Sequence, residues 1–111
     1  MLETDSTFRI DVMSVVRVGG EIDVASAPEL AKWLEAVPEG VDLVVDLSGV
    51  TFLDSTGLGV LVGAWNRCNN SGPPCRLALV VSTAEVERLL EVAGLSEVFE
   101  CFPTIEAATA R

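Results

Sequence analysis

The chain has 111 residues, 50% of them hydrophobic, and its 7 basic and 17 acidic residues give a formal net charge of -10. This length fits one domain of ordinary size. So acidic a surface repels nucleic-acid phosphates and anionic lipids, which argues against nucleic-acid and membrane partners and favours a basic protein partner.

Apolar periodicity predicts alternating strands and helices. Alternating or β-branched runs indicate strands, and apolar residues at i, i+3, i+4 and i+7 indicate helices with one buried face. In the first half of the chain we expect strands over 8–12 and 14–18 (interrupted by Gly19 and Gly20), a helix over 25–37 with Ser26 as N-cap, and a strand over 41–47 with a bend at Gly49. A helix follows from Asp54 or Ser55 to residue 68, and then a strand over 75–81. The last predicted elements are a helix over 84–94 capped by Ser82 or Thr83, a strand over 98–102 and a helical turn within 104–110. This order predicts an α/β fold with a mixed, mostly parallel sheet of four to five strands and about four helices.

The lack of a targeting signal and the pattern of cysteines indicate the same cellular compartment. The first six residues lack the basic and apolar regions of a signal peptide, and no apolar run approaches the roughly 20 residues that span a bilayer. The three cysteines Cys68, Cys75 and Cys101 have no metal-ligand spacing, which predicts reduced thiols. We therefore expect a cytoplasmic protein.

The stretch VTFLDSTGLGVLVGAW, residues 50–65, places two hydroxyls between an aspartate and a glycine-rich helix. A Ser-His-Asp triad is excluded because the chain has no histidine, and the only lysine, Lys32, lies on the predicted solvated side of its helix. The P-loop pattern is absent. Asp42, Asp46 and Asp54 could gather near strand ends, but without histidine and with scattered cysteines they would form only a weak site for a hard cation, so no metal or cofactor is predicted.

The remaining interpretation treats the hydroxyl as a phosphate acceptor. Ser55 lies where a helix begins, and the unpaired N–H groups expected there would favour a phosphate by about 0.3–2 kcal/mol. Gly59 and Gly63 lie one turn apart, although each costs the helix roughly 0.5–1 kcal/mol relative to alanine. Either close packing on the sheet or close approach of a partner would offset this cost, and Val60 adds an apolar side chain near Ser55.

The segments GEIDVASAPEL (20–30) and VVDLSGVTFLDSTGLGVLVGAW (44–65) closely resemble the STAS family, specifically its anti-sigma factor antagonists. The likeness extends over about residues 8–102, so 1–111 is expected to be a single STAS domain. It implies no catalytic activity. It also implies a partner-binding surface formed by Asp23, Asp54, Ser55, Thr56, Gly57, Leu58, Gly59 and Val60.

The resemblance implies a partner-switching cycle. The unphosphorylated domain would bind an anti-sigma factor that is also an ATP-dependent serine kinase, and so release a sigma factor. Phosphorylation of Ser55 would end this binding, and a PP2C-type phosphatase would restore it. Because the apolar stripes can all be buried internally, we expect a monomer.

Other functions remain open at this stage. A STAS domain could act as a regulatory or scaffold subunit of a transport or sensory complex without phosphorylation. Direct binding of a nucleotide or another small ligand is a second alternative, disfavoured by the acidic, lysine-poor motif. An enzyme of another type would have to rely on carboxylates and cysteines.

Overall fold

The computed structural model describes residues 2–10 and 12–110. Its elements are β1 (Leu2–Ile10), β2 (Met13–Ile22), α1 (Ala27–Glu35), β3 (Leu43–Leu53), α2 (Ser55–Asn70), β4 (Leu77–Val80), α3 (Ala84–Val92), β5 (Glu100–Phe102) and α4 (Ile105–Thr109). The predicted strand 8–12 reaches Ile10 in β1, Val12 lies in a turn, and residue 11 is outside the described residues.

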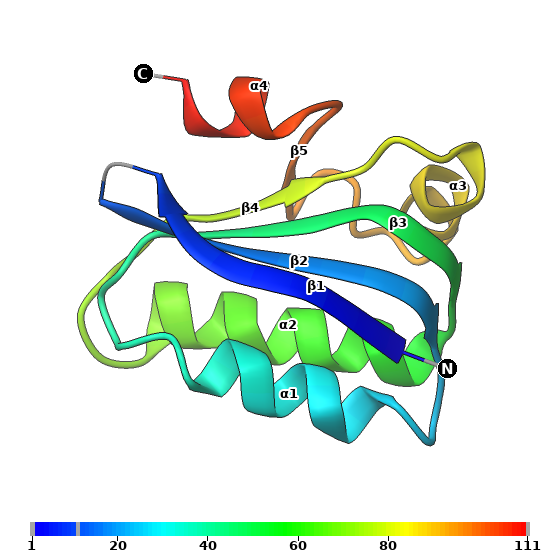
Figure 1. Cartoon of the computed structure of the whole chain (residues 1–111), viewed down its shortest axis with the longest axis horizontal. Coiled ribbons are helices and arrows are strands. Elements are labelled where there is room, and N and C mark those ends of the chain that lie inside the picture. The colour runs from blue at the N-terminus through cyan, green and yellow to red at the C-terminus, as the bar shows by residue number, and fades with distance from the viewer. Residues whose placement is uncertain (1, 11, 111) are drawn as a thin grey trace.

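All five strands form one sheet in the order β1-β2-β3-β4-β5. The β1–β2 pair is antiparallel, and the other three pairs are parallel. Helices α1 and α2 lie side by side along one face of the sheet, and α4 covers the other face near one end (Figure 1). The predicted α/β fold with a mixed, mostly parallel sheet is confirmed.

The inner strands are buried on both faces. Val16 and Val45 point toward the helices and belong to the larger core cluster, which also contains Leu34 of α1, Leu61 of α2 and Leu90 of α3. A smaller cluster on the opposite face lies under α4 and contains Met13, Val15, Val44, Ala78, Val80 and Ala108. Burial on both faces explains why these strands are almost continuously apolar in sequence.

Three glycines do not interrupt their strands as predicted. β2 continues through Gly19 and Gly20, and β3 continues through Gly49 as far as Leu53. Gly19 and Gly49 are paired across the two strands, and a Cβ on Gly49 would lie only 3.3 Å from the Gly19 Cα. The glycines therefore allow close approach of paired strands, and the irregularity they cause is a register shift.

The prediction of three reduced thiols is wrong for two of them. Cys68 near the end of α2 and Cys75 just before β4 form a disulfide, with their Cα atoms 4.7 Å apart. Cys101 is a free, exposed thiol. Helix α2 runs two residues past its predicted end, and the turn that follows reverses the chain, which brings the pair together.

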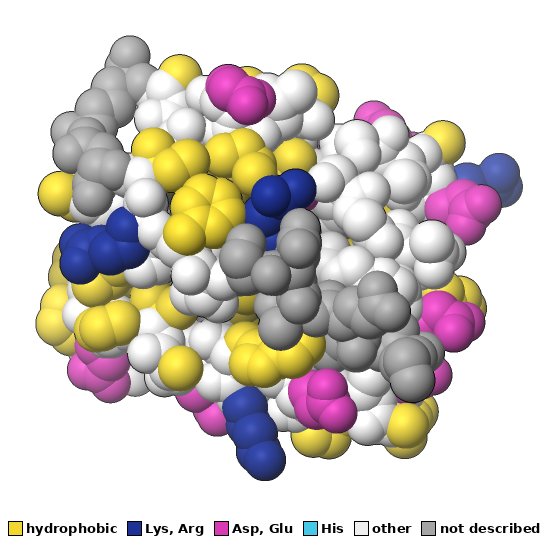
Figure 2. Space-filling model, in the orientation of Figure 1, with side chains coloured by type: hydrophobic (Ala, Val, Ile, Leu, Met, Phe, Trp, Pro, Cys, Tyr) yellow, Lys and Arg dark blue, Asp and Glu magenta, His cyan; other side chains and the backbone are white. Residues whose placement is uncertain are grey.

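The charged side chains on the surface are distributed as the acidic composition of the chain predicts. On the face seen in Figure 2, lysine and arginine side chains lie singly, and acidic side chains are scattered around the rim. Within the described ranges, no helix is both long and apolar enough to cross a membrane.

Candidate functional site

The candidate site lies where the carboxyl ends of the parallel strands β2 and β3 meet. Asp23 follows β2, and Asp54 follows β3. The backbone N–H of Asp54 donates to the carbonyl of Ile22 at 3.1 Å. This bond joins the loop that contains Asp23 to the residue immediately before Ser55, at the edge of the sheet where α/β folds place binding sites.

Asp54 caps helix α2. Its Oδ1 accepts the backbone N–H groups of Thr56 at 2.9 Å and Gly57 at 3.1 Å. The expectation of unpaired N–H groups around Ser55 is therefore wrong for these two donors, because the Asp54 carboxylate already binds them. The Ser55 side chain is exposed in the first turn of the helix. A phosphate there would meet the positive end of the helix dipole and, beside it, a carboxylate.

The neighbouring loop is organised by Asp23 and Ser26. Asp23 Oδ1 accepts the backbone N–H groups of Ala25 and Ser26, each at 3.0 Å. The Ser26 hydroxyl accepts from the Asp23 N–H at 2.9 Å and lies 3.0 Å from the Glu21 carbonyl oxygen. Ser26 stands at the predicted N-cap position, but its side chain forms no cap bond to α1 because these loop contacts use it.

These hydrogen bonds also set the charge of the site. The backbone N–H of Ser26, and then its hydroxyl, hold the pKa of Asp23 below its ordinary value of 3.8. Asp23 is therefore ionised at neutral pH. Together with Asp54, it gives the surface around Ser55 a negative character before any phosphate is added.

The predicted site residues divide into a surface set and a buried pair. Ser55, Thr56 and Gly59 are exposed, and Asp23, Asp54 and Val60 are partly buried, whereas Gly57 and Leu58 are buried. The buried pair lies on the underside of the helix, so it supports the surface and is not part of it.

Close packing on the sheet is the role of Gly57, and not of Gly59 or Gly63. A Cβ on Gly57 would clash with Leu53 Cδ1 and would lie 2.7 Å from Ile22 Cγ2. A Cβ on either Gly59 or Gly63 would meet nothing within 4 Å. Of the two explanations for Gly59 and Gly63, close packing on the sheet is thus wrong.

Two apolar residues near the site were missed by the sequence analysis. Val24, next to Asp23, is 71% exposed, and Phe52, close to Ser55 along the chain, is 48% exposed. At the end of β3 the register shifts, so that Glu21 pairs with Phe52 and Thr51 is the extra residue. The only hint in the sequence was the position of Val24 directly after Asp23, a residue predicted to bind a partner. Neither Val24 nor Phe52 belongs to an apolar repeat, so periodicity did not indicate them.

The other aspartates considered as ligands are separated and bonded elsewhere. Asp42 Oδ1 accepts the Arg76 backbone N–H at 2.9 Å. Asp46 is buried, and its Oδ2 lies 3.4 Å from Arg17 Nε. Over residues 2–10 and 12–110, no group of three or more His, Cys, Asp and Glu side chains is placed to hold a metal ion.

Comparisons with known proteins agree with the fold and the motif. A family model described as the STAS domain matches residues 4–108. The anti-sigma-B factor antagonist of Listeria monocytogenes is 41% identical over 85 residues, which cover 75% of this chain and 73% of that protein. The anti-sigma-B factor antagonist of Bacillus subtilis is 37% identical over 86 residues and 77% of each chain. The crystal structure of an anti-sigma factor antagonist from Mycobacterium paratuberculosis is 32% identical, with a TM-score of 0.85 over 97% of this chain and 91% of that one.

Proposed function

Since the chain belongs to the STAS domain family, we propose that it is an anti-sigma factor antagonist whose binding is switched off by phosphorylation of Ser55. The names of its relatives support the first part of the proposal. The second part rests on one observation: the Ser55 hydroxyl is exposed in the first turn of α2, where Asp54 already holds the neighbouring N–H groups.

The unphosphorylated surface is suited to docking. Val24 and Phe52 expose apolar side chains on the two segments that meet at the site, and Val60 adds a partly buried one. Ser55 and Thr56 lie exposed at the start of α2. The partner is an anti-sigma factor that is also a serine kinase, and docking brings the Ser55 hydroxyl to its ATP site.

Phosphorylation disrupts the docked state by electrostatics. The modification adds about two negative charges beside the Asp54 carboxylate and near Asp23. Docking would move this cluster out of water, and burying unpaired charge is costly. A penalty of about 3 kcal/mol weakens binding more than a hundredfold, at roughly 1.4 kcal/mol per decade.

The fold itself tolerates the phosphate. Ser55 points into solvent and is not part of the core, so the modified domain stays folded and changes only in what it binds. A PP2C-type phosphatase then returns it to the binding form. In this cycle the domain is a ligand and a substrate of enzymes, and it catalyses no reaction.

The first test is site-resolved mass spectrometry of the protein from its native cells, growing and stressed, with phosphatases inhibited. We expect phosphate at Ser55 with an occupancy that changes with the condition. Binding to the purified kinase should then be tight for the wild type and for Ser55→Ala, and at least a hundredfold weaker for Ser55→Asp. Ser71→Ala, at the exposed far end of α2 and outside this surface, is the matched control and should keep both binding and phosphorylation. Ser55 unmodified in every condition would contradict the proposal and favour a STAS scaffold that works by contact alone.

A further inference from the structure

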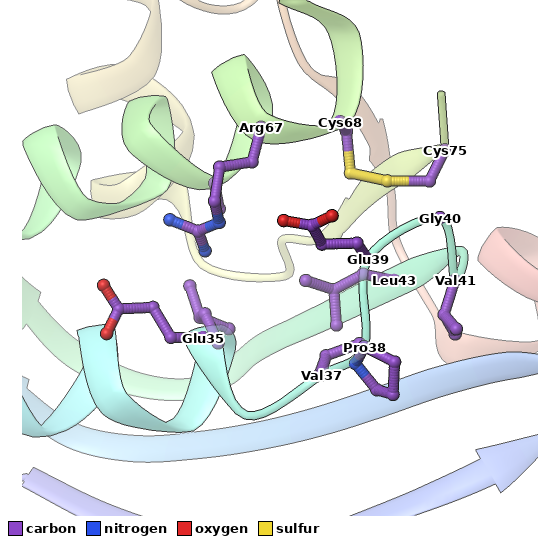
Figure 3. A pocket seen from close by; sticks show the side chains of 12 residues that line it. Glu35, Val37, Pro38, Glu39, Gly40, Val41, Leu43, Arg67, Cys68 and Cys75 are labelled. Atoms are coloured by element: carbon purple, nitrogen blue, oxygen red, sulfur yellow. A yellow bond between two sulfur atoms is a disulfide. The ribbon is translucent and has the colours of Figure 1, made fainter. Parts of the chain in front are cut away.

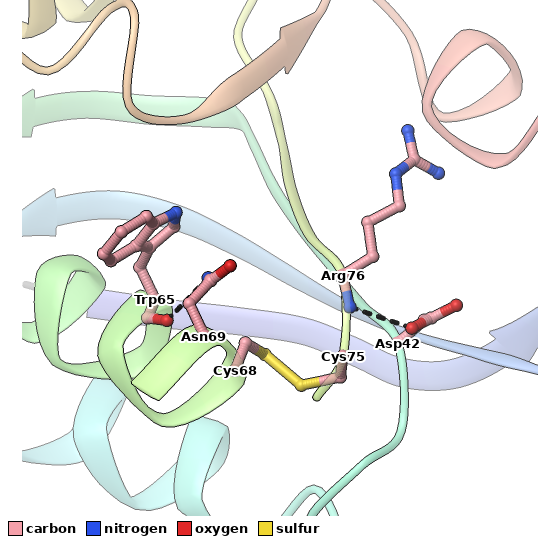
Figure 4. The surroundings of a disulfide bond; sticks show 6 residues. All are labelled: Asp42, Trp65, Cys68, Asn69, Cys75 and Arg76. Carbon is pink, nitrogen blue, oxygen red and sulfur yellow. Dashed lines mark hydrogen bonds between the residues drawn. A yellow bond between two sulfur atoms is a disulfide. The ribbon is translucent and has the colours of Figure 1, made fainter. Parts of the chain in front are cut away.

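The disulfide lies at the end of α2 remote from Ser55. Cys68 and Cys75 are seven residues apart and close a turn between α2 and β4 (Figure 4). Thirteen residues of helix at 1.5 Å each place Cys68 about 20 Å from Ser55. The disulfide is therefore too far from Ser55 to contact the proposed phosphorylation site.

Hydrogen bonds hold both cysteines in place without the sulfur–sulfur bond. The Cys75 backbone N–H donates to the Cys68 carbonyl at 3.0 Å. On the strand side, the Arg76 N–H donates to Asp42 Oδ1 at 2.9 Å, and on the helix side Asn69 Nδ2 donates to the Trp65 carbonyl at 2.9 Å (Figure 4). Breaking the disulfide leaves these bonds intact, so the two thiols stay adjacent and the pair can form again.

The turn also packs against a second loop. A Cβ on Gly40 would lie 3.0 Å from Pro73 Cβ, and a Cβ on Gly72 would lie 3.2 Å from a Glu39 carboxylate oxygen. Both glycines have φ above +70°, which favours glycine at these two turns. The contacts between the two loops give the reduced turn further support.

Solvent reaches the disulfide through a pocket of about 120 Å³. The pocket lies between the end of α1, the loop after it and the end of α2, and Cys68 and Cys75 form part of its wall (Figure 3). The two cysteines differ in access, because Cys68 is only 6% exposed within the main core cluster and Cys75 is partly exposed. Cys75 is therefore the more accessible residue of the pair.

We propose that Cys68 and Cys75 form a reversible thiol–disulfide modification site, opened by a dithiol reductant that enters through this pocket. One thiolate of the reductant attacks Cys75 Sγ, the Cys68–Cys75 bond breaks, and Cys68 Sγ takes the electron pair and a proton. The second thiol of the reductant then attacks the mixed disulfide, which releases Cys75 as a thiol. Two electrons and two protons pass to the protein, and the reductant becomes a cyclic disulfide.

The test uses the full chain carrying Cys101→Ser, which removes the third thiol. With dithiothreitol as the reductant in native buffer, followed by alkylation, mass spectrometry should find two labelled cysteines where the untreated protein has none. Circular dichroism should stay unchanged, and removal of dithiothreitol in the presence of oxidised glutathione should restore the unlabelled form. Three results would overturn the proposal. The first is labelling that occurs only in a denaturant, and the second is loss of the folded circular-dichroism signal on reduction. The third is labelling of both cysteines in untreated protein that persists after incubation with oxidised glutathione.

Single-cysteine variants test the route of access. Cys75 in the variant Cys68→Ser/Cys101→Ser should be alkylated at least tenfold faster than Cys68 in Cys75→Ser/Cys101→Ser. Equal rates would overturn the assignment of Cys75 as the attacked sulfur. Neither experiment requires a partner or phosphate, so its outcome is independent of the proposed role of Ser55.

Discussion

The two ends of helix α2 are held in different ways. At its start, Asp54 binds two backbone N–H groups and links to the end of β2, which leaves the Ser55 hydroxyl exposed. At its far end, Cys68 is buried and covalently attached to Cys75, two residues before β4. The start of α2 is thus fixed by hydrogen bonds that leave its surface accessible, and the opposite end is fixed by packing and a cross-link. The two ends can therefore be altered separately.

The largest stability effect is expected where the start of α2 packs on the sheet. Gly57→Val would place a branched side chain against Leu53 and Ile22, and overpacking of this kind costs about 3 kcal/mol. The matched control is Gly59→Ala in the same turn, which meets open space and should stabilise the helix by about 0.5–1 kcal/mol. Urea unfolding measures both, and a destabilised Gly59→Ala variant would contradict the placement of these glycines.

Next comes the disulfide at the far end. Closing a turn of this length restricts the unfolded chain, and opening it should lower the free energy of unfolding by about 2.5 kcal/mol. Urea unfolding of the Cys101→Ser chain with and without dithiothreitol gives this difference. The same comparison in a chain that also carries Cys68→Ser and Cys75→Ser should show no effect of the reductant. An equal effect there would mean that the disulfide is not its cause.

A smaller effect is expected at the cap. Asp54→Ala removes two hydrogen bonds to the first turn of α2 and should cost about 1 kcal/mol. Asp54→Asn keeps an oxygen acceptor and serves as the matched control, with most of the stability retained. If thermal unfolding showed the two variants equally destabilised, the charge of Asp54 rather than its cap bonds would be the important feature.

The smallest effect is the pH dependence contributed by Asp23. Its pKa is lowered in the folded protein, so the unfolded chain binds more protons and stability rises with pH across this range. The contribution is present above the ordinary value of 3.8 and is lost as the pH falls through the folded pKa. Asp23→Asn, which keeps an acceptor for the loop, should lose less stability than the wild type on acidification. Parallel urea midpoints for the two proteins from about pH 5 to about pH 2.5 would contradict this.

Local patterns predicted much of the fold because they encode which side of each element is buried. The i, i+3, i+4 repeat located α2, and the apolar runs located the inner strands of the sheet. The prediction failed at glycines and cysteines. Gly49 was read as a bend because its close pairing with Gly19 involves residues distant in sequence. Cys68 and Cys75 were read as thiols because their spacing does not reveal the turn that brings them together.

The candidate site, like the fold, was predicted only in part from the sequence. The motif around Ser55 can be recognised in the sequence, since the aspartate, the hydroxyl and the start of a helix are neighbours in the chain. The sequence of the motif does not show which of its residues are exposed in the folded protein. Gly57 and Leu58 were predicted to bind a partner and are buried, whereas Val24 and Phe52 were not among the predicted site residues and are exposed.

The sequence by itself determined the order of elements, the likeness to a family and the position of the candidate phosphorylation site, because these depend on residues close together in the chain. The tertiary structure decided which glycine packs on the sheet, which apolar residues remain on the surface and which two cysteines pair. Each of these depends on the distance between segments far apart in sequence, and only the folded sheet brings those segments together.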